Sequence, residues 1–290
     1  MPQKRRDKRF TSSASTDQRS AIKREAEQLI TDALQTRKSL KKEKIVALIV
    51  TGGGTAGDHF FNFEKTIKNR MIDLFDDCHL LLKSKRTPSA CILARSIIET
   101  YATGIYFFDE VMKTFQKDGI SAANQEITRF TNSSNIKVIS QKKFKSGFYD
   151  DKDYFITEQA RRRMENEEAQ VIHVNKALNY IFNGEKEISK TKESSLEACY
   201  ISLCEWNHPS QMSLFNTYSE GAEKSWTSVG ELTIFDLGFM QCAMALNLVT
   251  KLPQIFIHIA SAAETLSKAD NAPPLAVTIM HALTNALEKN

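Results

Sequence analysis

The sequence predicts an all-α protein. Apolar residues recur at helical spacing through most of the 290 residues, and alternating strand-like patterns are scarce. Hydrophobic residues make up 41% of the chain and charged residues 26%, which is typical of a soluble globular protein rather than a disordered chain or a membrane span. Five cysteines without a Cys-x-x-Cys pair argue against a disulfide scaffold and a structural zinc site, and favour a reducing, cytoplasmic location.

The expected helices begin and end at local signals. Asp17 is a candidate N-cap, and Pro88 opens a helix within its first turn. Asn183-Gly184 is a candidate C-cap, and Pro209 stops the helix before it. Residues 113–148 are polar and contain an Asn-Ser-Ser-Asn run, so we expect loops around one short helix there. The expected helices span residues 17–40, 58–85, 90–108, 153–182, 194–207, 234–250, 254–266 and 276–287.

Two of these helices are unusually apolar. Residues 90–108 carry only Arg95 and Glu99 as charges, and residues 234–250 carry only Asp236. A helix that is apolar on every face is typical of the centre of a bundle, so we expect two central apolar helices. Arg95 and Glu99 are four residues apart and share a helix face. Because buried ions need partners, the two side chains form either an internal ion pair that fixes packing or part of a site.

Charge divides the chain into a basic head (residues 1–40) and a helical bundle domain (residues 41–290). Residues 1–45 hold 13 Lys or Arg and 6 Asp or Glu, whereas the remainder is mildly acidic. The first 16 residues are polar and rich in Ser and Thr, which predicts a disordered tail. The tail either contacts the phosphates of RNA or DNA or is a solvated end without a ligand. Its basic side chains are Lys4, Arg5, Arg6, Lys8 and Arg9.

The helix that ends before Pro209 carries a second group of candidate residues. His208 precedes the proline and is expected at the helix C-terminus, where the helix dipole favours the imidazolium. Glu205 lies one turn earlier. A histidine within reach of a carboxylate titrates near neutral pH and can transfer protons. The alternative is a histidine that only caps the last carbonyl groups of the helix.

The segment Leu93-Ala94-Arg95-Ser96-Ile97-Ile98-Glu99, with the later Tyr200 and His208-Pro209-Ser210, resembles a bacterial helical domain-of-unknown-function family. That family is recognised by an Arg-x-x-x-Glu helix and a Tyr…His-Pro-Ser helix end. The resemblance spans residues 55–260 and leaves out the basic head. The family is distantly similar to HEPN-type helical proteins, many of which are metal-independent ribonucleases of toxin and phage-defence systems.

The resemblance implies an RNA-directed site assembled across two helices from Arg95, Glu99, Tyr200, Glu205 and His208. His208 would take a proton from the 2′-hydroxyl of RNA or protonate the leaving oxygen, and Arg95 would stabilise charge that develops on the phosphate. The two glutamates would orient these groups, and the basic head would gather the polyanion. Neither a metal nor a cofactor is expected for this chemistry.

Two other interpretations remain open at this point. In the first, the same polar residues hold the bundle together, and the protein is a non-enzymatic module that binds nucleic acid, another protein or a second copy of itself. In the second, four helices carry a di-metal carboxylate site. Its candidate ligands are Asp76, His79, Glu99, Glu205, His208 and Asp236.

The glycine-rich run at residues 52–57 matches the G-x-G-x-x-G fingerprint of dinucleotide-binding proteins. In those proteins the fingerprint belongs to a sheet of parallel strands, whereas here the following residues have helical periodicity. We therefore expect a hinge between helices at this run, and no nucleotide cofactor.

Overall fold

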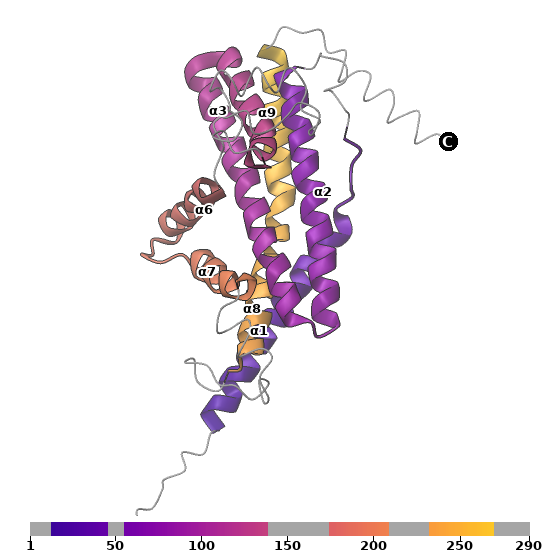
Figure 1. Cartoon of the computed structure of the whole chain (residues 1–290), viewed down its shortest axis with the longest axis vertical. Helices are drawn as coiled ribbons and strands as arrows, with labels where there is room; N and C mark the ends of the chain where they lie inside the picture. Colours follow the sequence, from indigo (N-terminus) through magenta and orange to yellow (C-terminus); the bar gives the residue numbers. More distant parts are fainter. Residues whose placement is uncertain (1–12, 46–54, 139–173, 209–231, 270–290) are drawn as a thin grey trace, which may run out of the picture. The chain divides into compact units, whose positions relative to one another are not determined.

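The computed structural model describes residues 13–45, 55–138, 174–208 and 232–269 (Figure 1). Among these residues there are helices and no β-strand, which confirms the all-α prediction. The basic side chains of the N-terminal tail, Lys4 to Arg9, lie outside the described residues. In chain order the helices are α1 (Ser13–Ser39), α2 (Ala56–Lys83), α3 (Thr87–Val138), α6 (Val174–Ser189), α7 (Ser195–Asn207), α8 (Ile234–Asn247), the short 3-10 helix η4 (Leu248–Lys251) and α9 (Leu252–Ala269).

Helices α2 and α7 have the predicted bounds to within two residues, because local signals define their ends. After α2, Lys85 adopts a left-handed conformation with φ 56°. The N–H of Arg86 then donates to the carbonyl of Leu81 at 2.8 Å and closes the last turn. At the start of α7, the Ser194 hydroxyl accepts the N–H of Glu197 at 2.9 Å, as an N-cap does.

Helix α3 is much longer than predicted. It continues through residues 113–138, so the expected loops are wrong for this part of the chain, and residues 139–148 lie outside the described residues. Gly119, with φ 82° and ψ −173°, is not helical, so α3 consists of two helical segments that meet at this residue. The chain reverses between them, because the rings of Phe107 and Phe130 lie 4.9 Å apart, whereas a continuous helix would separate these residues by about 35 Å. Gly119 therefore ends one helical segment, and the next begins after it.

Helix α6 also differs from the prediction at its C-terminus. It passes through Asn183-Gly184 and ends at Ser189, so the predicted C-cap is wrong. The residue after the helix, Lys190, has the left-handed φ of 54° that stops it. The N–H of Thr191 then donates to the carbonyl of Lys186 at 3.2 Å. Residues 153–173 of the helix expected at 153–182, and the helix expected at 276–287, lie outside the described residues.

The chain contains two compact units. Unit 1 comprises residues 1–39, 74–97 and 198–250, and unit 2 comprises residues 40–73, 98–197 and 251–290. Helices α2, α3 and α7 therefore each contribute residues to both units.

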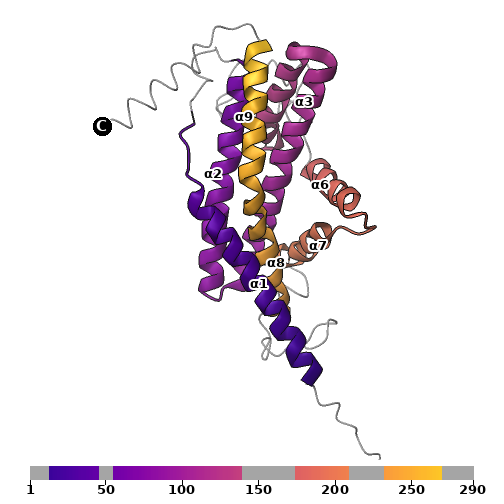
Figure 2. The same ribbon diagram turned by 180° about the vertical axis from the view of Figure 1, so that it is seen from behind.

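In unit 1, helix α1 lies against α8 (Figure 2). Arg19 on α1 pairs with Asp236 on α8 at 3.0 Å. Arg37 on α1 donates two hydrogen bonds to the carboxylate of Asp76 on α2, from Nε at 2.9 Å and from Nη2 at 2.6 Å. The helix predicted as part of the basic head is thus a packed member of unit 1, and these two arginines are matched by carboxylates.

In unit 2, α2, α3 and α9 run side by side (Figure 1). Aromatic rings fill the space between them. The centroid of the Phe107 ring lies 3.9 Å from that of Phe63, 4.9 Å from that of Phe130 and 5.2 Å from that of Phe60. Rings packed at these separations stabilise a core beyond the contribution of their buried area.

The two helices expected to be apolar on every face differ from each other. Ile92 on α3 is 41% exposed, and Arg95 and Glu99 are half-buried, so the prediction of burial on every side is wrong for this helix. In α8 every residue is buried or half-buried.

The segment Ile234–Ala269 is apolar and long enough to cross a membrane by length and composition alone, and 39% of its most apolar window is buried. The core helix of a soluble protein has the same composition, and this segment is interrupted by η4.

Candidate functional site

The structure brings together two of the residues selected from the sequence. Arg95 on α3 and Tyr200 on α7 are both half-buried, and the guanidinium carbon lies 5.6 Å from the centroid of the tyrosine ring. A guanidinium over an aromatic face at this distance is attracted by the ring quadrupole. We call this pair the Arg95–Tyr200 contact. It lies within unit 1 and leaves part of both side chains open to solvent.

Glu205 and His208 lie further along α7 and are both exposed. The backbone N–H of His208 donates to the carbonyl of Cys204 at 3.3 Å, so this histidine continues the last turn of the helix. Two turns of helix separate it from Tyr200, or about 12 Å along the axis at about 1.5 Å per residue. Glu99 is half-buried one turn after Arg95. Of the five predicted residues, Arg95 and Tyr200 are thus the two with a described contact.

Helix α7, which carries Tyr200, packs closely on α8. A Cβ atom on Gly238 would lie 3.0 Å from Trp206, so only glycine allows the indole to approach α8 this closely. Gln241 donates from Nε2 to the hydroxyl of Ser202 at 2.5 Å. The indole N–H of Trp206 and Oε1 of Gln241 are buried and have no hydrogen-bond partner in the part of the chain that the structure describes.

The di-metal arrangement is not assembled among the described residues. No group of three or more His, Cys, Asp or Glu side chains there lies close enough to hold a metal ion. Two of the proposed ligands have other partners: Asp76 bonds to Arg37, and Asp236 accepts bonds from Arg19 and from the backbone and side chain of Thr233. Burial alone would raise the pKa of Asp236, but these hydrogen bonds lower it below its ordinary value.

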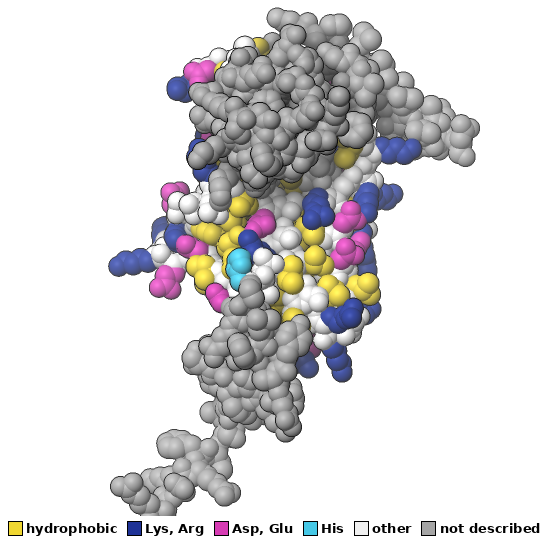
Figure 3. Space-filling view, in the orientation of Figure 1, with side chains coloured by type: hydrophobic (Ala, Val, Ile, Leu, Met, Phe, Trp, Pro, Cys, Tyr) yellow, Lys and Arg dark blue, Asp and Glu magenta, His cyan; other side chains and the backbone are white. Residues whose placement is uncertain are grey.

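Charges on the described surface give no single nucleic-acid-binding patch in the view of Figure 3. The Lys and Arg side chains on that face are scattered among Asp and Glu side chains and hydrophobic ones. The glycine run at residues 52–54 lies outside the described residues, and Gly57 belongs to α2, where a helix and not a strand surrounds it.

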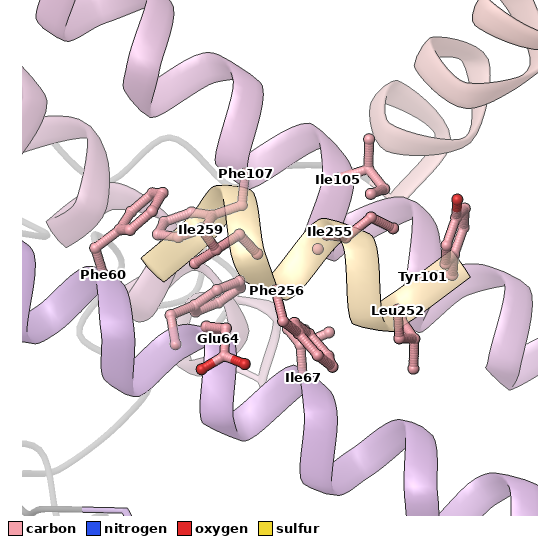
Figure 4. A pocket seen from close by; sticks show the side chains of 12 residues that line it. Phe60, Glu64, Ile67, Tyr101, Ile105, Phe107, Leu252, Ile255, Phe256 and Ile259 are labelled. Carbon is pink, nitrogen blue, oxygen red and sulfur yellow. The ribbon is translucent and has the colours of Figure 1, made fainter. Parts of the chain in front are cut away.

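Sequence reasoning missed a second candidate site, an apolar pocket in unit 2 between α2, α3 and α9 (Figure 4). Its space is about 350 Å³ when the opening to solvent is included. Among the described residues that line it, Glu64 has the one carboxyl, and this residue is 5% exposed. Oε2 of Glu64 has no hydrogen-bond partner among the described residues.

Charge and burial act in opposite directions on this carboxyl. Burial raises the pKa of Glu64 to about 7, although Lys68 and Lys65 lower it, and the neighbouring Glu43 raises it again. The carboxylate of Glu43 forms an ion pair with Lys68. A carboxyl that titrates near neutral pH inside an apolar wall can hold or release a proton under physiological conditions.

The sequence contains a signal for this second site. Phe60, Glu64, Ile67 and Met71 recur at spacings of four, three and four residues, which is the stripe that α2 turns toward the interior. A glutamate within such a stripe is rare, since carboxylates are almost never fully buried without a partner. The carboxyl could therefore have been selected from periodicity alone.

Comparisons with protein families, with curated proteins and with solved structures give no match to this chain.

Proposed function

We propose that the protein binds RNA on the surface formed by α3 and α7 in unit 1, in the manner of a defence- or toxin-type helical protein. The observation that carries the proposal is the Arg95–Tyr200 contact, a half-exposed guanidinium lying 5.6 Å from an aromatic ring. Unstacked RNA bases are recognised by stacking on aromatic rings and on guanidinium planes. Both kinds of surface are present here in one place.

The basic tail would supply the second part of the interaction. Contacts between lysine or arginine and phosphate release counterions, so they contribute affinity that falls with salt and carries little sequence preference. Affinity from base stacking depends much less on salt. Binding through both parts would therefore separate into a salt-dependent contribution from the five basic tail residues and a contribution from Tyr200 that persists at higher salt.

The test is titration of the full-length protein with a fluorescently labelled single-stranded RNA, followed by anisotropy at two salt concentrations. Stacking on an aromatic side chain contributes about 1–3 kcal/mol per base, so Tyr200→Ala should weaken binding about 5- to 150-fold while Tyr200→Phe retains the wild-type affinity. Arg95→Ala should also weaken binding. Arg70, an exposed arginine on α2 in unit 2, provides the matched control Arg70→Ala.

The binding proposal fails if Arg95→Ala and Arg70→Ala reduce affinity equally, because only general charge attraction would then be at work. It also fails if Tyr200→Ala binds as tightly as the wild type. Circular dichroism on each variant separates loss of binding from loss of folding. A DNA oligonucleotide of the same sequence tests whether the 2′-hydroxyl contributes.

Cleavage of the bound RNA is the second candidate function, and the exposure of His208 at the end of α7 favours it. An imidazole open to solvent on the helix that carries Tyr200 could remove a proton from a 2′-hydroxyl, while the guanidinium of Arg95 stabilises the phosphate. We expect a quenched fluorescent RNA to be cut in the presence of EDTA by the wild type and not by His208→Ala, with binding retained. If the wild type leaves the RNA intact, the protein is a binding module without this activity.

A further inference from the structure

All five cysteines of the chain belong to unit 1. Four of them are buried, and each comes from a different helix: Cys78 from α2, Cys91 from α3, Cys199 from α7 and Cys242 from α8. The sulfur atoms of Cys242 and Cys91 are 3.7 Å apart. Cys242 also forms a hydrogen bond with Cys78. The thiol of Cys199 donates to the carbonyl of Gln241 at 3.5 Å, next to Cys242 in the chain.

We propose that Cys91 and Cys242 are a redox pair that forms a disulfide between α3 and α8 on exposure to a peroxide. The bond needs the two sulfur atoms to approach from 3.7 Å to about 2.0 Å. The helix backbones already lie close together at this point, because a Cβ atom on Gly238, one turn before Cys242, would be 3.1 Å from the sulfur of Cys91. The two thiols are therefore placed to meet between α3 and α8.

The reaction balances with hydrogen peroxide as the oxidant. One thiol of the pair is oxidised to a sulfenic acid, and the peroxide is reduced with release of one water. The sulfur of the second cysteine then attacks the sulfenic sulfur, the S–O bond breaks, and the oxygen leaves as a second water. In total the pair loses two protons and two electrons, and one peroxide becomes two waters.

The environment of the pair makes this reaction slow. The hydrogen bond from Cys78 lowers the pKa of Cys242, but its bond to Cys91 and its burial raise that pKa further, and the net result lies well above the ordinary value. Because the thiolate is the reactive form, oxidation at neutral pH takes place only as fast as the rare thiolate or a local opening allows. The pair should therefore be reduced in a thiol-rich cytosol and become oxidised only under sustained peroxide exposure.

Peptide mapping of the full-length protein tests the proposal directly. The sequence places Cys91 in the tryptic peptide of residues 87–95 and Cys242 in that of residues 225–251. Cys78 falls in residues 71–83, and Cys199 and Cys204 fall together in residues 193–224. After treatment with hydrogen peroxide, alkylation of the remaining thiols and digestion without reductant, mass spectrometry should find peptides 87–95 and 225–251 joined, with the loss of two hydrogens. Dithiothreitol should separate them.

Cys91→Ala should abolish the joined species, and Cys204→Ala, which removes the half-exposed thiol outside the buried group, should leave it unchanged. The link joins residues 151 positions apart, so the oxidised protein should also melt at a higher temperature than the reduced one. Two results overturn the proposal. One is recovery of Cys91 as the alkylated thiol under conditions that oxidise Cys204, and the other is a link between residues 71–83 and 225–251 instead. Both are read on the wild type, so neither depends on the folding of a variant.

Discussion

The interiors of the two units are both packed between helices, but their buried side chains differ in type. The described core of unit 1 contains buried thiols and aliphatic residues, with the aromatic side chains of Phe75 and Trp206, and its buried polar residue is Thr233. The described core of unit 2 contains stacked aromatic rings and buries two carboxylates and a lysine, those of Asp58, Glu64 and Lys65. Both interiors are helical and closely packed. They differ in their expected sensitivity to pH and to oxidants.

A buried thiol is neutral at physiological pH and costs little to desolvate, so the interior of unit 1 should be nearly insensitive to pH and sensitive to oxidants. A buried carboxyl changes charge within the physiological range when burial raises its pKa toward neutrality. The interior of unit 2 should therefore be sensitive to pH, and it has no thiol to oxidise.

Truncation of an aromatic ring in unit 2 should have the largest effect. Phe107 is 2% exposed and packs against three other rings. We expect Phe107→Ala to lower the free energy of unfolding by about 3–5 kcal/mol, measured by urea unfolding with circular dichroism. In unit 1, Cys242→Ala removes a single heavy atom and should cost about 1 kcal/mol. Equal losses for the two variants would contradict the distinction between an aromatic and a thiol interior.

The pH dependence of unit 2 should come from Glu64. Its pKa is about 7 in the folded protein against 4.5 for the ordinary group. Below the lower value the carboxyl is protonated in both states, and its contribution to stability is fully present. As pH rises through the folded pKa, the ionised carboxylate must be accommodated in the pocket, and stability falls by about 3 kcal/mol in total. Glu64→Gln cannot ionise, so it should gain stability relative to the wild type between pH 4.5 and pH 8.

Urea unfolding of both proteins at the two pH values measures this gain. The control is Glu264→Gln, which changes an exposed carboxylate on α9 that pairs with Lys268 at 2.7 Å. Its pKa is lowered by that lysine, so its charge stays constant above pH 6 and the substitution should leave the slope of stability against pH unchanged there. If Glu64→Gln also leaves the slope unchanged, the carboxyl is not desolvated in the folded state.

Much of the fold could be predicted because the residues that begin or end a helix act on the backbone next to them. Pro88 acts on its own backbone at the start of α3, and the residues around Ser194 do so at the start of α7, so both helices begin near the expected positions. The same local reasoning was wrong at Asn183-Gly184, where the sequence contains residues that often end a helix and α6 continues. In residues 113–138 the expected loops are replaced by helical segments that meet at Gly119.

The candidate sites were harder to predict because they depend on packing between distant segments. The sequence led to Arg95 and Tyr200 as separate motifs, and the structure places them in contact. It gave no indication that cysteines on four helices meet, since their spacing along the chain has no pattern. Glu64 could have been found, because its position on the buried stripe of α2 is a property of that helix alone.

Glycine substitutions in unit 2 should have effects of opposite sign at two positions. A Cβ atom on Gly57 would lie 2.0 Å from the hydroxyl oxygen of Ser267 and 2.3 Å from the backbone oxygen of Ala263. Because a backbone atom cannot turn aside, we expect Gly57→Ala to cost about 1–3 kcal/mol in urea unfolding. At Gly184, inside α6, a Cβ atom would meet nothing within 4 Å, and Gly184→Ala should stabilise the protein by about 0.5–1 kcal/mol. A loss at both positions would show that close approach of the helices is not the cause.

A small effect of about the same size should come from a motif that the two units share. Thr233 and Asp236 form a capping box at the start of α8 in unit 1, and Thr55 and Asp58 form the equivalent bonds at the start of α2 in unit 2. Loss of a threonine N-cap costs about 1 kcal/mol, so each Thr→Ala substitution should lower the free energy of unfolding by about this amount. Thr233 is 3% exposed and Thr55 is half-buried, and removing a bond that water cannot replace costs more. Thr233→Ala should therefore cost more than Thr55→Ala in parallel urea titrations, whereas Thr233→Ser, which keeps the hydroxyl, should recover most of the loss. The reverse order would mean that the exposure of a cap does not control its contribution in this protein.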